Sequence, residues 1–227
     1  MINTISAITA QQKNPNRVNI FVDGSYGFSL SRIVAAWLRV GEILDEKAKQ
    51  KLLEQDEYEV AFSRAAHYLS YRARTTSELQ RKLKDLGFPE TVVDHVIQRC
   101  TELHMLNDAE FAETYVHFRI NNRPRSKRLL AMELRAKGLP DNLIQCALSD
   151  VHDDSQLAYQ TAMIYLKRVQ SLPYDQFQQK LMGYLNRRGF AYYLSRQTIQ
   201  TLWNELQSDP KHSLSYMNEG DDVERIN

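Results

Sequence analysis

The stretch Leu79–Pro89, with the sequence LQRKLKDLGFP, decides the fold because it returns twice along the chain. The segments LAMELRAKGLP at 130–140 and LMGYLNRRGFA at 181–191 follow it at a constant step of 51 residues. In each copy two leucines four residues apart share one helix face, and the glycine after them can adopt the left-handed conformation that ends a helix. In the first two copies proline follows and suits the first turn of a new helix, whereas the third copy has Ala191 there. Each copy therefore predicts a helix, a glycine turn and a second helix.

The repeat extends on both sides of these segments. Val93 and Ile144 are in register, as are Ile97, Leu148 and Ile199. With a further helix in front, each unit contains three helices and is too small to bury its own apolar faces, so neighbouring units must stack. We predict a mainly α protein with three such units, period 51, in an elongated and curved array. The first helix of the third unit fits the period only after a slip of about five residues.

The N-terminal region has a different pattern. Thr4–Thr9, Val18–Val22 and Tyr26–Leu30 are short β-branched or aromatic runs separated by turn residues, which predicts a small antiparallel sheet of three strands. Leu30–Leu38 is expected to form a covering helix. From Asp45 the pattern is helical, with one helix opening at Asp45–Lys47 and another over Tyr58–Arg72. The predicted divisions are an N-terminal β extension with its covering helix (1–44), a connecting helix and repeat 1 (45–104), repeat 2 (105–150), repeat 3 (151–207), and a disordered acidic tail (208–227).

Composition narrows the class of protein. The 227 residues carry 29 basic and 28 acidic side chains, 25% charged and 43% hydrophobic residues, which is typical of a folded, soluble chain. The net charge of +1 does not by itself indicate a nucleic-acid partner. Cys100 and Cys146 lie far apart in helical patterns, and no secretory signal or membrane-spanning stretch is present. We expect a cytoplasmic protein.

No catalytic centre is indicated. The six histidines show no paired metal-binding spacing, and neither a Cys-x-x-Cys pair nor a phosphate-binding GxxxxGK loop occurs. Asp108 and Glu110 are expected to open a helix, where acids favour the dipole. We predict no catalytic residues, no metal, no cofactor and no enzyme activity.

Two basic linkers are the candidate binding site. Arg72-Ala73-Arg74-Thr75 returns one period later as Arg123-Pro124-Arg125-Ser126. Arginines beside the first turn of a helix suit an anion, either a phosphate or a carboxylate of a partner, although solvated helix starts look similar. The candidates are Arg72, Arg74, Arg119, Arg123, Arg125, Lys127 and Arg128, with Lys167, Arg168, Lys180, Arg187 and Arg188 as further candidates in the third repeat, which lacks the linker motif.

We expect the aromatic residues to stabilise the fold rather than to bind a ligand. Twelve tyrosines are present, and we expect them to pack between helices with the hydroxyl at the surface rather than to act as stacking platforms for single-stranded bases. Trp37 and Trp203 are expected in the core. His67 and His117 are interpreted as helix-surface or core residues.

Taken together, these residues resemble the RecX family. AAHYLSYRART at 65–75, followed by Glu78-Leu79 and Gly87-Phe88, is similar to its first repeat. LNDAEFA at 106–112 and RPRS at 123–126 are similar to its second, most diagnostic repeat. The likeness covers about residues 56–205, and the N-terminal segment resembles the β extension of longer members.

The resemblance implies a regulator of the RecA recombinase, with a role in homologous recombination, DNA repair and the SOS response. Family members bind RecA and its filament on single-stranded DNA, and typically inhibit ATP hydrolysis, filament growth and strand exchange. We expect this protein to act by binding alone, as a monomer, with direct contact to single- or double-stranded DNA left open. The alternative is a helical DNA-binding regulator that acts without RecA.

Overall fold

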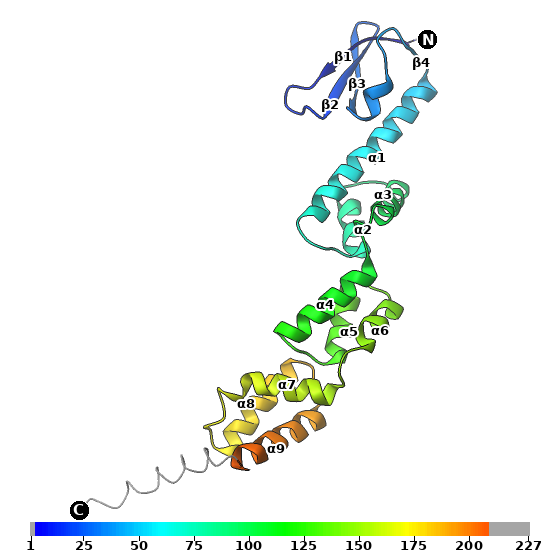
Figure 1. The fold of residues 1–227 in the computed structure, drawn as a ribbon. Helices are drawn as coiled ribbons and strands as arrows, with labels where there is room; N and C mark the ends of the chain where they lie inside the picture. Colours follow the sequence, from blue (N-terminus) through cyan, green and yellow to red (C-terminus); the bar gives the residue numbers. More distant parts are fainter. Residues whose placement is uncertain (1–2, 209–227) are drawn as a thin grey trace, which may run out of the picture. The chain divides into compact units, whose positions relative to one another are not determined.

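The computed structural model describes residues 3–208 and confirms a mainly helical chain with an N-terminal antiparallel sheet (Figure 1). The chain divides into two compact units between Asp108 and Ala109. The helices form three successive groups of three. They are α1 (Glu46–Ser70), α2 (Thr76–Asp85) and α3 (Glu90–Glu102) in repeat 1; α4 (Asp108–Asn122), α5 (Lys127–Ala136) and α6 (Asp141–Ser149) in repeat 2; and α7 (Asp154–Leu166), α8 (Tyr174–Arg187) and α9 (Tyr192–Ser208) in repeat 3. The elongated, curved arrangement of the repeats stays a prediction.

The middle helix of each repeat is the element that the sequence period marks. Its two leucines are fully buried in every case: Leu79 and Leu83, Leu130 and Leu134, Leu181 and Leu185. The glycines that follow have φ angles of +87°, +80° and +85°, in the left-handed region. Three residues beyond the end of α2, the backbone N–H of Phe88 donates to the carbonyl of Leu83 (3.3 Å), and the equivalent bond closes the other two turns. The predicted helix–glycine–helix unit is confirmed.

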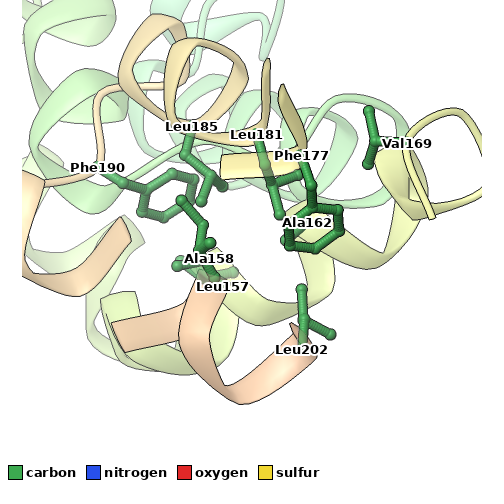
Figure 2. Packing of buried hydrophobic residues seen from close by; sticks show 10 residues of the cluster. Leu157, Ala158, Ala162, Val169, Phe177, Leu181, Leu185, Phe190 and Leu202 are labelled. Atoms are coloured by element: carbon green, nitrogen blue, oxygen red, sulfur yellow. The ribbon is translucent and has the colours of Figure 1, made fainter. Parts of the chain in front are cut away.

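Each repeat has its own core, built from the leucines of the middle helix and small residues of the first. In repeat 1, Ala61 and Ala65 of α1 are fully buried against α2 and α3. In repeat 3, Ala158 and Ala162 of α7 pack beside Phe177, Leu181 and Leu185 of α8 (Figure 2). Small side chains on the first helix allow the bulky ones of the second to approach closely.

The sheet has four strands rather than the predicted three. The strands β1 (Asn3–Ala10), β2 (Arg17–Val22), β3 (Ser25–Ser31) and β4 (Ile43–Leu44) lie in the order β3-β2-β1-β4, with antiparallel pairing throughout. β4 contains only two residues, which is too short for an alternating pattern to be visible in the sequence.

Three other predictions for the first 72 residues are wrong. The expected covering helix at 30–38 is a single 3₁₀ turn, η1 (Val34–Trp37), and Trp37 is 89% exposed rather than in the core. Only Val34 and Ala35 of that turn are buried under the sheet. The two helices expected from Asp45 to Arg72 are one continuous helix, α1, capped at its start by Asp45.

The sheet is joined to α1 by a largely buried ion pair. Arg17 of β2 lies 2.9 Å from Asp56 of α1, and the other oxygen of that carboxylate accepts the backbone N–H of Ser31. Asp56 is 7% exposed, so its charge is compensated by Arg17 in a site that water hardly reaches. This pairing holds the β extension on the long helix of repeat 1.

Successive repeats are connected by caps that cross from one helix group to the next. Asp108, the first residue of α4, accepts the N–H of Thr76 at the start of α2 (2.8 Å). Asp154, the first residue of α7, accepts the N–H of Lys127 at the start of α5 in the same way (2.8 Å). The two acids are separated by 46 residues, five fewer than the period, in agreement with the predicted slip.

Repeats 2 and 3 also touch at the glycine turn of repeat 3. The N–H of Ser126 donates to the carbonyl of Arg188 (3.0 Å), and its hydroxyl donates to the carbonyl of Gly189 (2.8 Å). A Cβ at Gly189 would lie 2.7 Å from both the Ser126 Oγ and the Leu129 Cβ, whereas a Cβ at Gly87 would meet nothing within 4 Å.

This difference predicts unequal costs for the same substitution. Gly87→Ala meets only the strain of a positive φ, and we expect it to lower the free energy of unfolding by about 1 kcal/mol. Gly189→Ala adds overlap with the start of α5, which costs roughly 1–3 kcal/mol more. Urea unfolding of the two variants measures the difference, and equal destabilisation would contradict the described contact between repeats 2 and 3.

Candidate functional site: the basic linkers

The first linker lies between α1 and α2 and places its two arginines in different surroundings. Arg72 is exposed and forms an ion pair with Glu78 (3.2 Å). Arg74 is half-buried, lies 3.9 Å above the ring of Tyr68 and donates to that tyrosine's hydroxyl (3.0 Å). Arg72 is therefore the more available of the two for a partner, while Arg74 also fixes the linker against α1.

The second linker is built around one carboxylate. Glu133 of α5 is the acid that stands alone among the basic residues from Arg119 to Lys137. It accepts a hydrogen bond from the Tyr115 hydroxyl (2.7 Å), forms an ion pair with Arg125, and lies 3.3 Å from the Nε of Arg119. Arg119 also donates to the Tyr115 hydroxyl (2.8 Å). We call these four residues the Glu133 network.

The Glu133 network contains more positive charge than its carboxylate compensates. Burial lowers the pKa of Arg125, and the charges of Arg119, Arg188 and Arg123 lower it further. Within the described residues, the Nε of Arg125 and the Nη1 of Arg188 are buried and have no hydrogen-bond partner. Arg188 comes from the end of α8, so the linker of repeat 2 and the glycine turn of repeat 3 share one basic region.

Three basic residues of the second linker border the network. Arg123 and Arg128 are exposed, and Lys127 is half-buried. Lys127 and Arg128 line an open hollow of about 420 Å³ together with Arg135. Arg123 and Arg128 take part in none of the ion pairs of the described residues. They are the linker cations best placed to meet an external anion.

The third-repeat candidates are spread over α7, α8 and the turns beside them. Lys167, Arg168, Lys180 and Arg187 are exposed, and Arg188 is half-buried with its guanidinium 4.9 Å from the centre of the Tyr184 ring. Only Arg188 joins the basic region of repeat 2. The structure brings together Arg119, Arg123, Arg125 and Arg188, while Arg72 and Arg74 belong to the other compact unit.

The tyrosines divide into two groups. Tyr68, Tyr115, Tyr159, Tyr165 and Tyr184 are half-buried between helices, as predicted. Tyr71, Tyr192 and Tyr193 contradict the prediction, being 71%, 64% and 64% exposed. Trp203, half-buried against Phe177 with its ring 5.1 Å away, is at the edge of the repeat 3 core.

Residues 3–208 contain neither a candidate metal centre nor a candidate membrane-spanning helix. No group of three or more His, Cys, Asp or Glu side chains in that range could hold a metal ion. No helix there is long and apolar enough to cross a membrane. Both cysteines are free thiols, and burial raises the pKa of Cys100.

The roles of two carboxylates, those of Asp108 and Glu133, could not be predicted from the sequence. Asp108 was expected to favour its own helix, but its carboxylate caps α2 of the preceding repeat. The sequence shows that Glu133 is the one acid among the basic residues from 119 to 137. Its role as their shared counter-ion also depends on contacts with Tyr115 and Arg119 of the preceding helix, which residue spacing does not reveal.

The fold and the linkers define a helical-repeat protein with an N-terminal sheet and clustered arginines. Three RecX sequence models match the chain: the N-terminal domain of regulatory protein RecX at residues 3–45, the first three-helix domain at 61–100 and the second at 107–148. The chain belongs to the RecX family of regulatory proteins.

Individual relatives and solved structures agree with this assignment. Regulatory protein RecX of Bacillus velezensis is 34% identical over 192 residues, which cover 83% of this chain and 73% of the relative. That of Bacillus subtilis matches with the same identity and coverage. A crystal structure of regulatory protein RecX is similar, with a TM-score of 0.68 and 30% identity, and the match covers 86% of this chain and 98% of the other. The crystal structure of RecX from Lactobacillus salivarius has a TM-score of 0.56 and 28% identity, and the match covers 65% of this chain and 97% of the other.

The charge excess around Glu133 predicts an anion-sensitive stability. Glu133→Gln leaves Arg119 and Arg125 without their counter-ion, and we expect it to lower the free energy of unfolding by about 1–3 kcal/mol. Sulfate should restore part of that loss by screening or occupying the cluster. Thermal unfolding with and without sulfate measures both effects.

Glu113→Gln is the matched control, since Glu113 is exposed on α4 and outside the Glu133 network. It should change stability by less than about 0.5 kcal/mol, with no specific response to sulfate. The same loss in both variants would show that Glu133 does not hold the linker.

Proposed function

We propose that this protein regulates RecA by binding the filament that RecA forms on single-stranded DNA, and that it lowers ATP hydrolysis, filament growth and strand exchange. It acts by binding alone, in the cytoplasm, and catalyses no reaction. The observation that carries the proposal is the match of three RecX domain models to residues 3–148, in a chain whose three repeats are structurally intact.

The basic linkers are the proposed contact with the filament. Arg72, Arg123 and Arg128 are exposed cations at the starts of α2 and α5. The half-buried residues of the Glu133 network hold the second linker in place beneath them. Arginine forks can bind the carboxylates of an acidic protein surface or the phosphates of DNA. Several weak contacts to neighbouring RecA subunits would add through effective concentration.

The proposed contact is tested with charge reversal at the two exposed linker arginines. Arg123→Glu with Arg128→Glu should weaken binding to RecA filaments at least about tenfold, because two attractive contacts become repulsive. The measurement is co-sedimentation with filaments assembled on single-stranded DNA. These positions are preferable to Arg125, whose reversal would also place two acids side by side in the Glu133 network.

The control is Arg64→Glu with Arg81→Glu, which makes the same charge change at exposed positions of α1 and α2 away from the linkers. It should bind filaments as the unchanged protein does. Equal binding by both double variants would exclude the second linker as the contact. Failure of the unchanged protein to bind RecA, with retained binding to bare DNA, would favour a DNA-binding regulator that acts without RecA.

A further inference from the structure

The three repeats share one backbone but differ sharply on the surface around the glycine turn. Four exposed positions near the end of the middle helix and the start of the last helix can be compared between repeats, because they recur every 51 residues. Repeat 1 has Asp85, Glu90, Thr91 and Asp94; repeat 2 has Ala136, Asp141, Asn142 and Gln145; repeat 3 has Arg187, Tyr192, Tyr193 and Arg196. The surface therefore changes from strongly acidic, through weakly acidic, to basic and aromatic.

In the first two repeats, the end of the middle helix faces the start of the last helix. Lys84 at the end of α2 lies 2.8 Å from Glu90 at the start of α3, and Arg135 lies 2.7 Å from Asp141 in the equivalent place. The pKa of Lys84 is raised first by its hydrogen bond to Glu90 and also by the charge of Asp94, one turn further along α3. The corresponding residues Asn186, Tyr192 and Arg196 of repeat 3 accordingly share one face.

Repeat 3 has lost the ion pair of this face and has gained rings and free cations. Tyr192 and Tyr193 are each 64% exposed, and Arg196 follows them by one helical turn. Arg187 is the exposed last residue of α8. In the described part of the chain, neither Arg187 nor Arg196 takes part in an ion pair. We call Arg187, Tyr192, Tyr193 and Arg196 the Tyr–Arg face.

We propose that the Tyr–Arg face binds single-stranded nucleic acid, with bases stacked on the two tyrosine rings and phosphates paired with the two arginines. Stacking on aromatic rings beside a basic surface is the common mode of sequence-independent single-strand binding. The adjacent turn, Arg188 and Gly189, contacts Ser126, so the face continues into the basic region of repeat 2. The inference stands independently of the proposed contact with RecA.

The surroundings of the face favour nucleic acid over a protein partner. From 186 to 200 the exposed large apolar side chains are the two tyrosines, and the other exposed side chains there are small, polar or basic. A protein interface would be expected to include an apolar core that excludes water. Two exposed rings flanked by two arginines outside any ion pair, with no other large exposed apolar side chain from 186 to 200, match bases and phosphates better.

The test uses the full chain, without RecA, and a fluorescein-labelled single-stranded oligodeoxynucleotide of about 30 nucleotides, a length that exceeds the sites of single domains. Fluorescence anisotropy gives the affinity at several salt concentrations. Tyr192→Asn with Arg196→Gln should weaken binding about tenfold or more. The slope of log affinity against log salt should fall in magnitude by about 0.7, the value for one lost phosphate contact on a single strand.

Tyr71→Asn with Arg64→Gln is the matched control, since it removes one exposed ring and one exposed arginine from α1 and the turn after it. It should bind the oligonucleotide within about twofold of the unchanged protein, a change that corresponds to less than 0.5 kcal/mol. Circular dichroism and thermal unfolding establish that both variants fold. Arg196→Gln alone provides a milder variant that should still lower the salt slope.

Three results would overturn the proposal: no binding of the oligonucleotide by the unchanged protein, equal weakening in both double variants, or no weakening in either. If the Tyr192/Arg196 variant keeps its DNA affinity but loses its effect on RecA, the face contacts protein instead. If the unchanged protein inhibits RecA without binding bare DNA, the proposed function stands and this inference fails.

Discussion

The left-handed glycine turn between the second and third helices is the constraint on which each repeat depends. It ends the middle helix just after its two fully buried leucines and lets the last helix begin a few residues later. At Gly189 the missing side chain has a second consequence, because the start of α5 occupies the space that a Cβ would need. The turn that closes repeat 3 is thus also the surface on which repeat 2 rests.

The same architecture carries different chemistry in each repeat because the exposed positions are free to vary. The buried leucines of the middle helix and the glycines of the turn recur at a fixed spacing, while the surface near the turn changes from Asp85, Glu90 and Asp94 to Arg187 and Arg196. In the linkers, arginine is used both to bind inward, as Arg74 does on Tyr68, and to remain exposed, as Arg123 does. The exposed basic and aromatic side chains are therefore distributed along the chain, and each repeat exposes a different set.

The sequence predicted the helices of the repeats well because periodic leucines and glycines report burial and helix ends directly. It located three strands, and it also anticipated the slip before repeat 3. It missed β4, which has only two residues and forms by pairing with β1, and it also missed the continuity of α1 and the exposure of Trp37. At the site, the arginines were found from their repetition, but their pairing with Glu133 depends on how α4 and α5 pack.

We propose that this member of the RecX family regulates RecA by binding. The most direct measurement is ATP hydrolysis by RecA from the same organism on single-stranded DNA, followed while this protein is added. The account predicts that hydrolysis falls when the protein is present at well below one molecule per RecA, because one bound molecule affects several subunits. Unchanged hydrolysis at an equimolar ratio or above, together with salt-sensitive binding to bare DNA, would contradict it.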